Sequence, residues 1–316
     1  MHTVTGPVRY FYLRKPRGQE DVPDWPPLTK PLEGPDNKVC AAVRLYADSE
    51  GWRAEYVESL AAPVTGQDPA FVLNRNTALG LLQDGKRTKA DVQLLGVRVV
   101  NLDAKGVEYA THLVVRAMAG SGFGLSRRPI VVPADAIVLG EYIEHGDRAV
   151  AALDLRVTPA EYANMPIFLP DAQILPAARR ALDQTVLSTA RFYSYGNVAK
   201  HGISLEVEAG RVSLHGRVDL RDVGDQVREA MLATPGVVEV ADHLLYVEDL
   251  QENVQAALEA KGMGAIQVLS EHALIVLDGV VADSKARYAA EDIARKIPGV
   301  RGVVNNVVVQ AQTANA

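Results

Sequence analysis

Glycine-rich and histidine-containing segments are the parts of this sequence whose residue types could support binding or catalytic chemistry. Gly120, Gly122 and Gly124 lie in the segment AGSGFGLSRRP, which has the composition of a loop that wraps around a phosphate. Such a loop must open a helix whose N-terminus faces the phosphate, whereas Pro129 and the β-branched run at residues 130–132 predict a strand. The segment is therefore predicted to be a hairpin and not a nucleotide site.

The histidines and the single cysteine show no pattern typical of a metal site or of a nucleophile. None of the seven histidines has an HxxxH or HExxH spacing, and no Cys/His ligand pattern surrounds Cys40. The sequence also contains no Gly-x-Ser-x-Gly nucleophile elbow. It therefore predicts no catalytic residue, no metal site and no cofactor, and an enzyme is the least supported hypothesis. The histidines are His2, His112, His145, His201, His215, His243 and His272.

Arg127 and Arg128, at the tip of the predicted Gly-rich hairpin, form a basic cluster with Lys86, Arg87 and Lys89 upstream. Guanidinium groups bind phosphates and carboxylates through paired hydrogen bonds, so Arg127 and Arg128 are candidates for contact with an anion. The alternative is that they are ordinary solvated loop charges, because the surrounding β segment is neutral as a whole.

Composition and charge restrict the classes of protein to which this chain can belong. Its 316 residues are 48% hydrophobic, which is enough for two or three domains with apolar cores. A net charge of −6 argues against a general nucleic-acid binder, which needs an excess of Lys and Arg. We find neither a signal-peptide pattern nor an apolar run long enough for a membrane span, and expect a cytoplasmic protein, with peripheral attachment to a membrane as an alternative.

Residues 1–38 are predicted to be a tail or an extended arm. Six prolines lie between Pro16 and Pro35, a composition that forms neither a helix nor a central strand. After this arm, alternating segments on either side of residues 48–51 predict a hairpin that opens the next domain.

Residues 39–170 are predicted to form a small antiparallel β-barrel with that hairpin at its N-terminus. A loop rich in Pro, Gly and Asn follows the hairpin at residues 63–76. Two alternating segments then flank a turn at residues 103–106, and at least two further strands have turns at residues 133–135 and 145–147. Short strands at this spacing are typical of a small barrel or sandwich.

Residues 80–170 resemble the PRC-barrel family. The resemblance rests on LGVRVVNLDAKGVEYATHLVV, on the Gly-rich hairpin GSGFGLSRRPIVVP and on the closing segment VTPAEYANMPIF. The fold of this family is shared by the cytoplasmic part of the photosynthetic reaction-centre H subunit and by a ribosome maturation factor. The resemblance implies a docking module rather than an enzyme.

The last third of the chain contains one unit twice. A shift of 63 residues places Gly216 on Gly279 and Pro235-Gly236-Val237 on Pro298-Gly299-Val300, and no gap is required. We divide this part into a helical connector with the first unit, residues 171–248, the second unit, residues 249–310, and a tail, residues 311–316. The predicted structural residues of the repeat are Gly216, Gly279, Pro235, Gly236, Pro298 and Gly299.

Each copy has the pattern of an αββαβ unit. In the second copy, ENVQAALEAKG predicts a helix that Gly262 ends, AIQVLSEHALIVLDGVV a hairpin, and DSKARYAAEDIARKIPG a helix before the last strand. Asp283 and Ser284 are candidates for the N-cap of this last helix, and Arg295 and Lys296 complement its dipole. A glycine at the same place in both hairpins predicts a close backbone approach or a bulge.

The two copies, over about residues 183–310, resemble the BON domain. The shared glycine of each hairpin, the two Pro-Gly-Val turns and the closing segments VADHLLYV and VNNVVVQ carry the resemblance. BON domains occur in osmotically induced periplasmic proteins, in secretin-like and mechanosensitive channel proteins and in a cytoplasmic potassium-binding protein. The resemblance implies binding to phospholipid surfaces or to other proteins, and no catalytic residue belongs to the motif.

The two copies differ in charge. Residues 203–248 carry four basic and nine acidic residues, whereas residues 266–310 carry five of each. An anionic bilayer repels an acidic unit, so a face that binds cations or a basic protein is at least as well supported as one that binds lipid. We therefore expect an α+β multidomain, non-enzymatic interaction or structural protein that docks partners or self-associates. The alternative is a stress-response module that binds a phospholipid surface or potassium.

Overall fold

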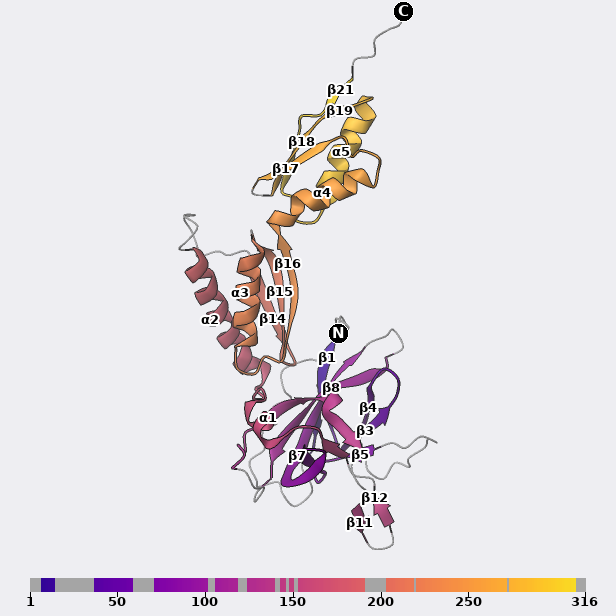
Figure 1. Ribbon diagram of the computed structural model, residues 1–316, viewed down its shortest axis with the longest axis vertical. Coiled ribbons are helices and arrows are strands. Elements are labelled where there is room, and N and C mark those ends of the chain that lie inside the picture. Colours follow the sequence, from indigo (N-terminus) through magenta and orange to yellow (C-terminus); the bar gives the residue numbers. More distant parts are fainter. Residues whose placement is uncertain are drawn as a thin grey trace, which may run out of the picture. The chain divides into compact units, whose positions relative to one another are not determined.

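Figure 1 shows the computed structural model of the chain, which contains both helices and strands, with strands prevailing, as expected for an α+β protein. Two compact units can be distinguished. Met1–Ala178, Val207–Val212 and Thr234–Glu239 form unit 1, and Arg179–Glu206, Ser213–Ala233 and Val240–Ala316 form unit 2. The structure describes residues 7–14, 37–58, 71–101, 106–118, 124–139, 143–145, 148–150, 153–190, 203–218, 220–271 and 273–310.

Unit 1 is built on one curled sheet of 11 strands (Figure 1). The main path through the sheet is β10-β13-β6-β7-β8-β4-β3-β5, with β1 paired to β7 and β2, and β9 paired to β8. The strands are β1 Val8–Leu13, β2 Lys38–Cys40, β3 Ala42–Ala47, β4 Trp52–Val57, β5 Phe71–Leu73, β6 Ala78–Gln83, β7 Lys86–Asn101, β8 Glu108–Ala117, β9 Ile130–Pro133, β10 Ile137–Leu139 and β13 Leu153–Leu155. Two pairs, β1–β2 and β13–β6, are parallel, so the expectation of a purely antiparallel sheet is wrong for them.

The hairpins predicted within this sheet are confirmed. β3 pairs antiparallel with β4 on either side of residues 48–51. One carboxylate oxygen of Asp48 accepts the N–H groups of Glu50, at 2.8 Å, and Gly51, at 3.0 Å, which stabilises the turn. β7 and β8 pair antiparallel as predicted for the second hairpin, whose turn at residues 103–106 lies outside the described residues except for Gly106. Part of the predicted loop at residues 63–76 is instead the strand β5, which pairs with β3.

The N-terminal arm does not extend over the whole of residues 1–38, because residues 8–13 form β1. This strand pairs antiparallel with β7 and parallel with β2, and all of its side chains but one are buried. β1 precedes the first proline of the Pro-rich segment, so the composition of that segment says nothing about it. The Pro-rich segment itself, residues 16–35, lies outside the described residues.

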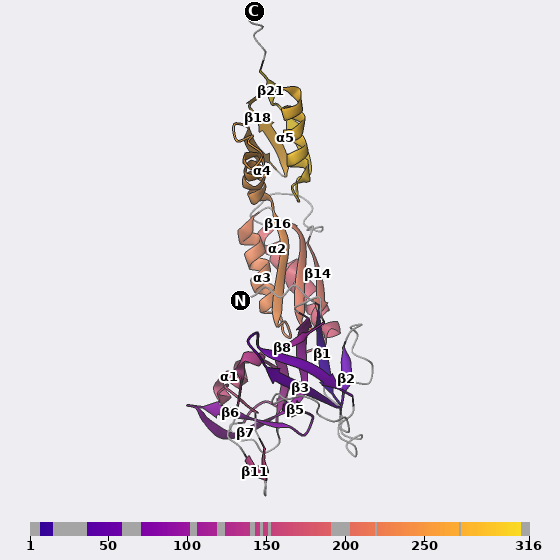
Figure 2. The ribbon, with the colours of Figure 1, turned by 90° about the vertical axis from the view of Figure 1, so that its right-hand side faces the viewer.

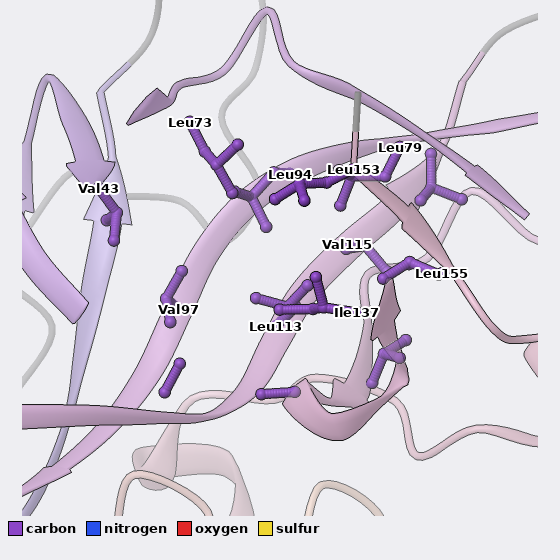
Figure 3. Packing of buried hydrophobic residues seen from close by; sticks show 14 of the residues in the cluster. Val43, Leu73, Leu79, Leu94, Val97, Leu113, Val115, Ile137, Leu153 and Leu155 are labelled. Atoms are coloured by element: carbon purple, nitrogen blue, oxygen red, sulfur yellow. The ribbon is translucent and has the colours of Figure 1, made fainter. Parts of the chain in front are cut away.

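The curled sheet buries side chains on both of its faces, and β1 contributes to both. Phe11 and Leu13 belong to the larger of two hydrophobic clusters. Tyr10 and Tyr12, which alternate with them, belong to a second cluster that includes Phe168. Because side chains alternate between the two faces of a strand, β1 is buried on both sides. Figure 3 shows part of the larger cluster, where side chains from β7, β8, β10 and β13 converge.

The C-terminal third contains the elements of the two repeats. A short helix, α1 Pro159–Asn164, and the helix α2 Asp171–Ala190 precede them. The first repeat consists of β14 Ile203–Glu208, β15 Arg211–Val218, α3 Arg221–Leu232 and β16 Glu239–Tyr246. The second consists of α4 Leu250–Glu259, β17 Gln267–Glu271, β18 Leu274–Asp278, β19 Val280–Val281, α5 Ser284–Lys296, β20 Gly302–Asn305 and β21 Val308–Val309.

The two repeats have sheets of the same order. The first is β14-β15-β16 and the second is β17-β18-β20, in which β17 is antiparallel and β20 parallel to β18. In the second repeat α4 and α5 lie against one face of the sheet (Figures 1 and 2). Val254 and Leu258 of α4 are fully buried there with Ile275 and Leu277 of β18. The opposite face of this sheet carries no helix of the repeat.

Candidate interaction surfaces

A buried guanidinium connects three segments of unit 1. Arg98 on β7 is only 1% exposed. Its Nε donates to the carbonyl oxygen of Ala209 at 2.9 Å, and its Nη1 donates to the hydroxyl of Thr111 at 3.0 Å. Its Nη2 donates to the carboxylate of Glu239 at 2.9 Å. A buried charge is tolerated when it is paired and hydrogen-bonded, and Arg98 meets both conditions.

The turn between β14 and β15, whose Ala209 carbonyl accepts from Arg98, is held by Asp171. Ala209 and Gly210 have φ angles of 48° and 75°. A residue with a Cβ rarely adopts a positive φ, so Ala209 needs support from its surroundings. Asp171 provides it by accepting the N–H groups of Ala209, at 2.8 Å, and Gly210, at 2.9 Å. Burial raises the pKa of Asp171, and these two hydrogen bonds oppose the rise.

His112 on β8 borders this ionic network. Its Nδ1 lies 3.5 Å from Nη1 of Arg98. Burial, followed by the charge of Arg98, lowers the pKa of His112 from 6.5 to about 3, so the ring is neutral near pH 7. Sequence reasoning missed the network because the partners of Arg98 are separated from it by 13, 111 and 141 residues. No local spacing could have indicated it.

The glycines of the two predicted Pro-Gly-Val turns have different surroundings. Gly236 has a φ of 87° and Gly299 a φ of 96°, both in the left-handed region. A Cβ on Gly236 would lie 2.8 Å from Cγ1 of Ile174 and 2.8 Å from Cβ of Leu169. On Gly299 the nearest atom would be the end of the Leu250 side chain, at 3.2 Å. Gly236 is therefore required for both its backbone conformation and its small size, and Gly299 mainly for its backbone.

The other predicted structural residues lie in turns or strands of the repeats. Pro235 and Pro298 are exposed beside the two glycines. Gly216 on β15 has a φ of 130°, and Gly279, between β18 and β19, has a φ of 145°. A Cβ on Gly279 would lie 3.1 Å from the carbonyl oxygen of Ala265, so the backbone approaches closely there.

The predicted basic cluster is only partly available to an anion. Arg127 and Arg128 are exposed. Arg87 is engaged elsewhere, because its guanidinium lies 3.0 Å from the carboxylate of Asp91 and 3.2 Å from that of Asp154. Arg87 is therefore removed from the cluster. Arg127 and Arg128 stay candidates for contact with an anion, because neither side chain has an ion-pair partner among the described residues.

In the described ranges, no group of three or more His, Cys, Asp or Glu side chains is placed so that it could hold a metal ion. Cys40 is buried in the larger cluster of the sheet, and burial raises the pKa of its thiol to about 11, as expected for a structural cysteine. None of the described helices combines the length and the apolar composition that crossing a bilayer requires.

The open face of the second repeat's sheet carries an apolar row. The strand register aligns Leu269 on β17 with Val276 on β18, and Val276 with Val304 on β20. Leu269 is 61% exposed and Val304 41% exposed. Leu274, two residues before Val276 on the same face, is 42% exposed. We call Leu269, Leu274, Val276 and Val304 the apolar row.

The corresponding face of the first repeat lacks this row of large aliphatic side chains. In the shift of 63 residues, the counterparts of Leu269, Leu274, Val276 and Val304 are Glu206, Arg211, Ser213 and Ala241, of which the first three are polar. Glu206 is exposed, as are His215 and His243 further along β15 and β16. The two copies differ in net charge in the sequence. The structure adds that the same sheet face is largely polar in the first copy and apolar in the second.

The BON domain matches residues 189–248 and 246–311. The two matches cover the two repeats, so we call them BON repeats from here on. No curated protein matches the chain significantly.

Two solved structures of CdsD, a structural protein of the type III secretion system of Chlamydia trachomatis, are similar to part of the chain. The first, of the C-terminal domain, is 15% identical, with a TM-score of 0.31, and the match covers 42% of this chain and 66% of that one. The second is 15% identical, with a TM-score of 0.32 and coverages of 42% and 63%. The matched part thus spans less than two thirds of each CdsD chain.

Proposed function

We propose that this chain is a non-enzymatic interaction or structural protein that docks a protein partner or a second copy of itself. In this proposal residues 39–170 are a PRC-barrel-like docking domain, residues 171–248 contain the first BON repeat and residues 249–310 the second. The two BON matches support an interaction role, because no catalytic residue belongs to that domain.

The apolar row of the second BON repeat is the observation that carries the proposal. Aliphatic side chains on three adjacent strands are exposed there on a face that no helix of the repeat covers. Val280 and Val308, which pair on β19 and β21, are also 58% and 60% exposed. Contiguous exposed apolar groups are a common mark of an interaction site. Removing each half-exposed aliphatic side chain from water on binding contributes about 1 kcal/mol to the free energy of association.

Charge around the apolar row favours a protein over an anionic lipid surface. Glu271 follows Leu269 by two residues on β17, and Asp278 follows Val276 by two residues on β18, so both acidic residues share the face of the row. Both are exposed. An anionic bilayer attracts basic residues by about 1 kcal/mol each and repels acidic ones. A partner with an apolar patch and basic residues at its rim fits this face best.

The proposal can be tested by changing the row without disturbing the core of the repeat. We expect size-exclusion chromatography with light scattering to show a mass that rises with concentration for the wild type. The double variant Leu269→Asp/Val304→Asp should stay monomeric. Tyr288→Asp, at a 65% exposed position of α5, is the matched control and should behave as the wild type.

Circular dichroism spectra that agree among these three proteins would exclude unfolding as the cause. The proposal is wrong if the wild type stays monomeric at every concentration and also binds no protein whose capture the double variant abolishes.

The alternative function is binding of a phospholipid surface or of potassium, which the BON resemblance implies. Flotation with anionic and zwitterionic vesicles tests the first, and calorimetry with potassium chloride tests the second. Vesicle binding that the double variant loses would favour the lipid function over docking of a protein. The absence of a response in both assays would remove the alternative.

A further inference from the structure

Two histidines of the first BON repeat lie together on its sheet. The rings of His215, on β15, and His243, on β16, are stacked with centroids 4.9 Å apart and planes inclined by 16°. The two strands are neighbours in the sheet. Both histidines are exposed, whereas the adjacent residues Leu214 and Leu244 are buried. Side chains alternate along a strand, so both imidazoles lie on the open face.

These imidazoles are available to a ligand. Neither forms a hydrogen bond or an ion pair with any residue in the part of the chain that the structure describes. A histidine that orders a protein core would have such a partner, and it would be buried. Glu206, exposed on β14 of the same sheet, adds a negative charge, and residues 203–248 carry nine acidic and four basic residues. Arg217 follows His215 by two residues on β15, but the acidic excess of the segment as a whole favours a cation.

We propose that His215 and His243 together bind one divalent transition-metal ion of the copper, nickel and zinc group. Neutral imidazole is a preferred ligand of these ions, and it is a poor ligand of potassium, magnesium or calcium. Two nitrogens that bind one ion at about 2.0–2.1 Å each lie roughly 3 Å apart in a tetrahedral site. The rings are nearly parallel in the structure, and imidazole nitrogens bind a metal in the ring plane, so both side chains must rotate for their nitrogens to point at one ion. Water fills the remaining coordination positions.

The second BON repeat provides an internal control for this site. In the shift of 63 residues, Asp278 occupies the position of His215 and Asn306 the position of His243. Both are exposed on the same fold. A site that depends on the pair of imidazoles must therefore be confined to the first repeat, and removal of Asp278 and Asn306 must leave it intact.

Titration calorimetry of the full chain without a histidine tag, using zinc chloride and nickel chloride, tests the proposal. We expect one ion per chain in the wild type. His215→Ala and His243→Ala should each weaken its affinity at least tenfold, because each leaves a single imidazole. Asp278→Ala/Asn306→Ala should bind as the wild type does. Wild-type affinity in either histidine variant, or no binding to the wild type, overturns the proposal.

Electron paramagnetic resonance with copper(II) provides a readout that an effect on folding alone would not produce. The wild type should show two coordinating imidazole nitrogens, and each single histidine variant should show one. A spectrum with two nitrogens in His243→Ala would assign the ion to other histidines and overturn the proposal. The metal site does not depend on the apolar row, so Leu269→Asp/Val304→Asp should retain it whatever its oligomeric state.

Discussion

The guanidinium of Arg98 donates to the carboxylate of Glu239 at 2.9 Å, although 141 residues separate them in the sequence. Arg98 is central in the curled sheet, and Glu239 is the first residue of β16 in the first BON repeat. Both belong to unit 1, together with the turn at Ala209 that Arg98 also binds. The curled sheet and these two segments of the repeat therefore share one buried ionic network.

Removing the central cation of this network should destabilise the protein strongly. In Arg98→Met the carbonyl of Ala209 loses this donor, and the carboxylate of Glu239 keeps only its ion pair with Arg211, at 3.3 Å. Breaking a buried ion pair costs about 3–5 kcal/mol, and since Glu239 is partly exposed we expect a loss of about 2–4 kcal/mol in the free energy of unfolding. Urea denaturation followed by circular dichroism measures this loss.

An exposed ion pair supplies the control for this variant. Arg53 and Glu55 lie 3.0 Å apart with side chains 44% and 38% exposed. Arg53→Met should cost less than about 1 kcal/mol, because solvent screens such a pair. If Arg53→Met and Arg98→Met lost equal stability, the buried network would not be the cause.

The two Pro-Gly-Val turns should respond differently to the same substitution. Gly236→Ala introduces a Cβ at 2.8 Å from atoms of Ile174 and Leu169 as well as a strained φ. We expect a loss of about 2–4 kcal/mol in the free energy of unfolding. Gly299→Ala has a similar φ but meets only the flexible end of Leu250, so about 1–2 kcal/mol is expected. Equal losses in thermal or urea denaturation would contradict this assignment.

Local sequence signals predicted local structure well. Asp48, Glu50 and Gly51 indicated the turn between β3 and β4, and the carboxylate of Asp48 accepts hydrogen bonds inside that turn. The internal repeat was visible because the apolar positions and turns of both copies coincide over one fixed shift. In these cases the residues that determine the structure lie within a few positions of one another.

Contacts between distant segments could not be predicted in this way. The strand β1 lacks an alternating pattern because Tyr10 and Phe11 face two different hydrophobic clusters, and its main partner β7 lies far along the chain. Arg98 has no neighbour in sequence that marks it as buried. The apolar row did leave a signal, since the run LIVL on β18 is apolar on both faces, whereas a strand with one solvated face alternates.

The structure decides between the two N-cap candidates of α5, Asp283 and Ser284. The carboxylate of Asp283 accepts the N–H of Ala286 at 2.7 Å, so Asp283 is the N-cap. Asp283→Ala should therefore lower the free energy of unfolding by about 1 kcal/mol. Ser284→Ala, inside the first turn of the helix, should change it by less than about 0.5 kcal/mol. Reversed effects would assign the cap to Ser284.

The pH dependence of stability should contain a contribution from His112. Its pKa is lowered from 6.5 to about 3 in the folded chain by burial and by Arg98, so the unfolded chain binds more protons between these values. Stability is therefore lost as the pH falls below about 6.5, and the loss continues until the folded state also takes up a proton. Between pH 7 and pH 4.5 this contribution is about 2–3 kcal/mol.

The variant His112→Asn isolates this contribution from that of the carboxylates. Asparagine offers Arg98 an acceptor oxygen near the position of Nδ1 but does not titrate in this range. Carboxylates titrate in both proteins, so their effect cancels when the two unfolding free energies are subtracted. We expect the wild type to lose about 2–3 kcal/mol more than His112→Asn between pH 7 and pH 4.5. Parallel stability curves would show that His112 takes up its proton equally well in the folded chain.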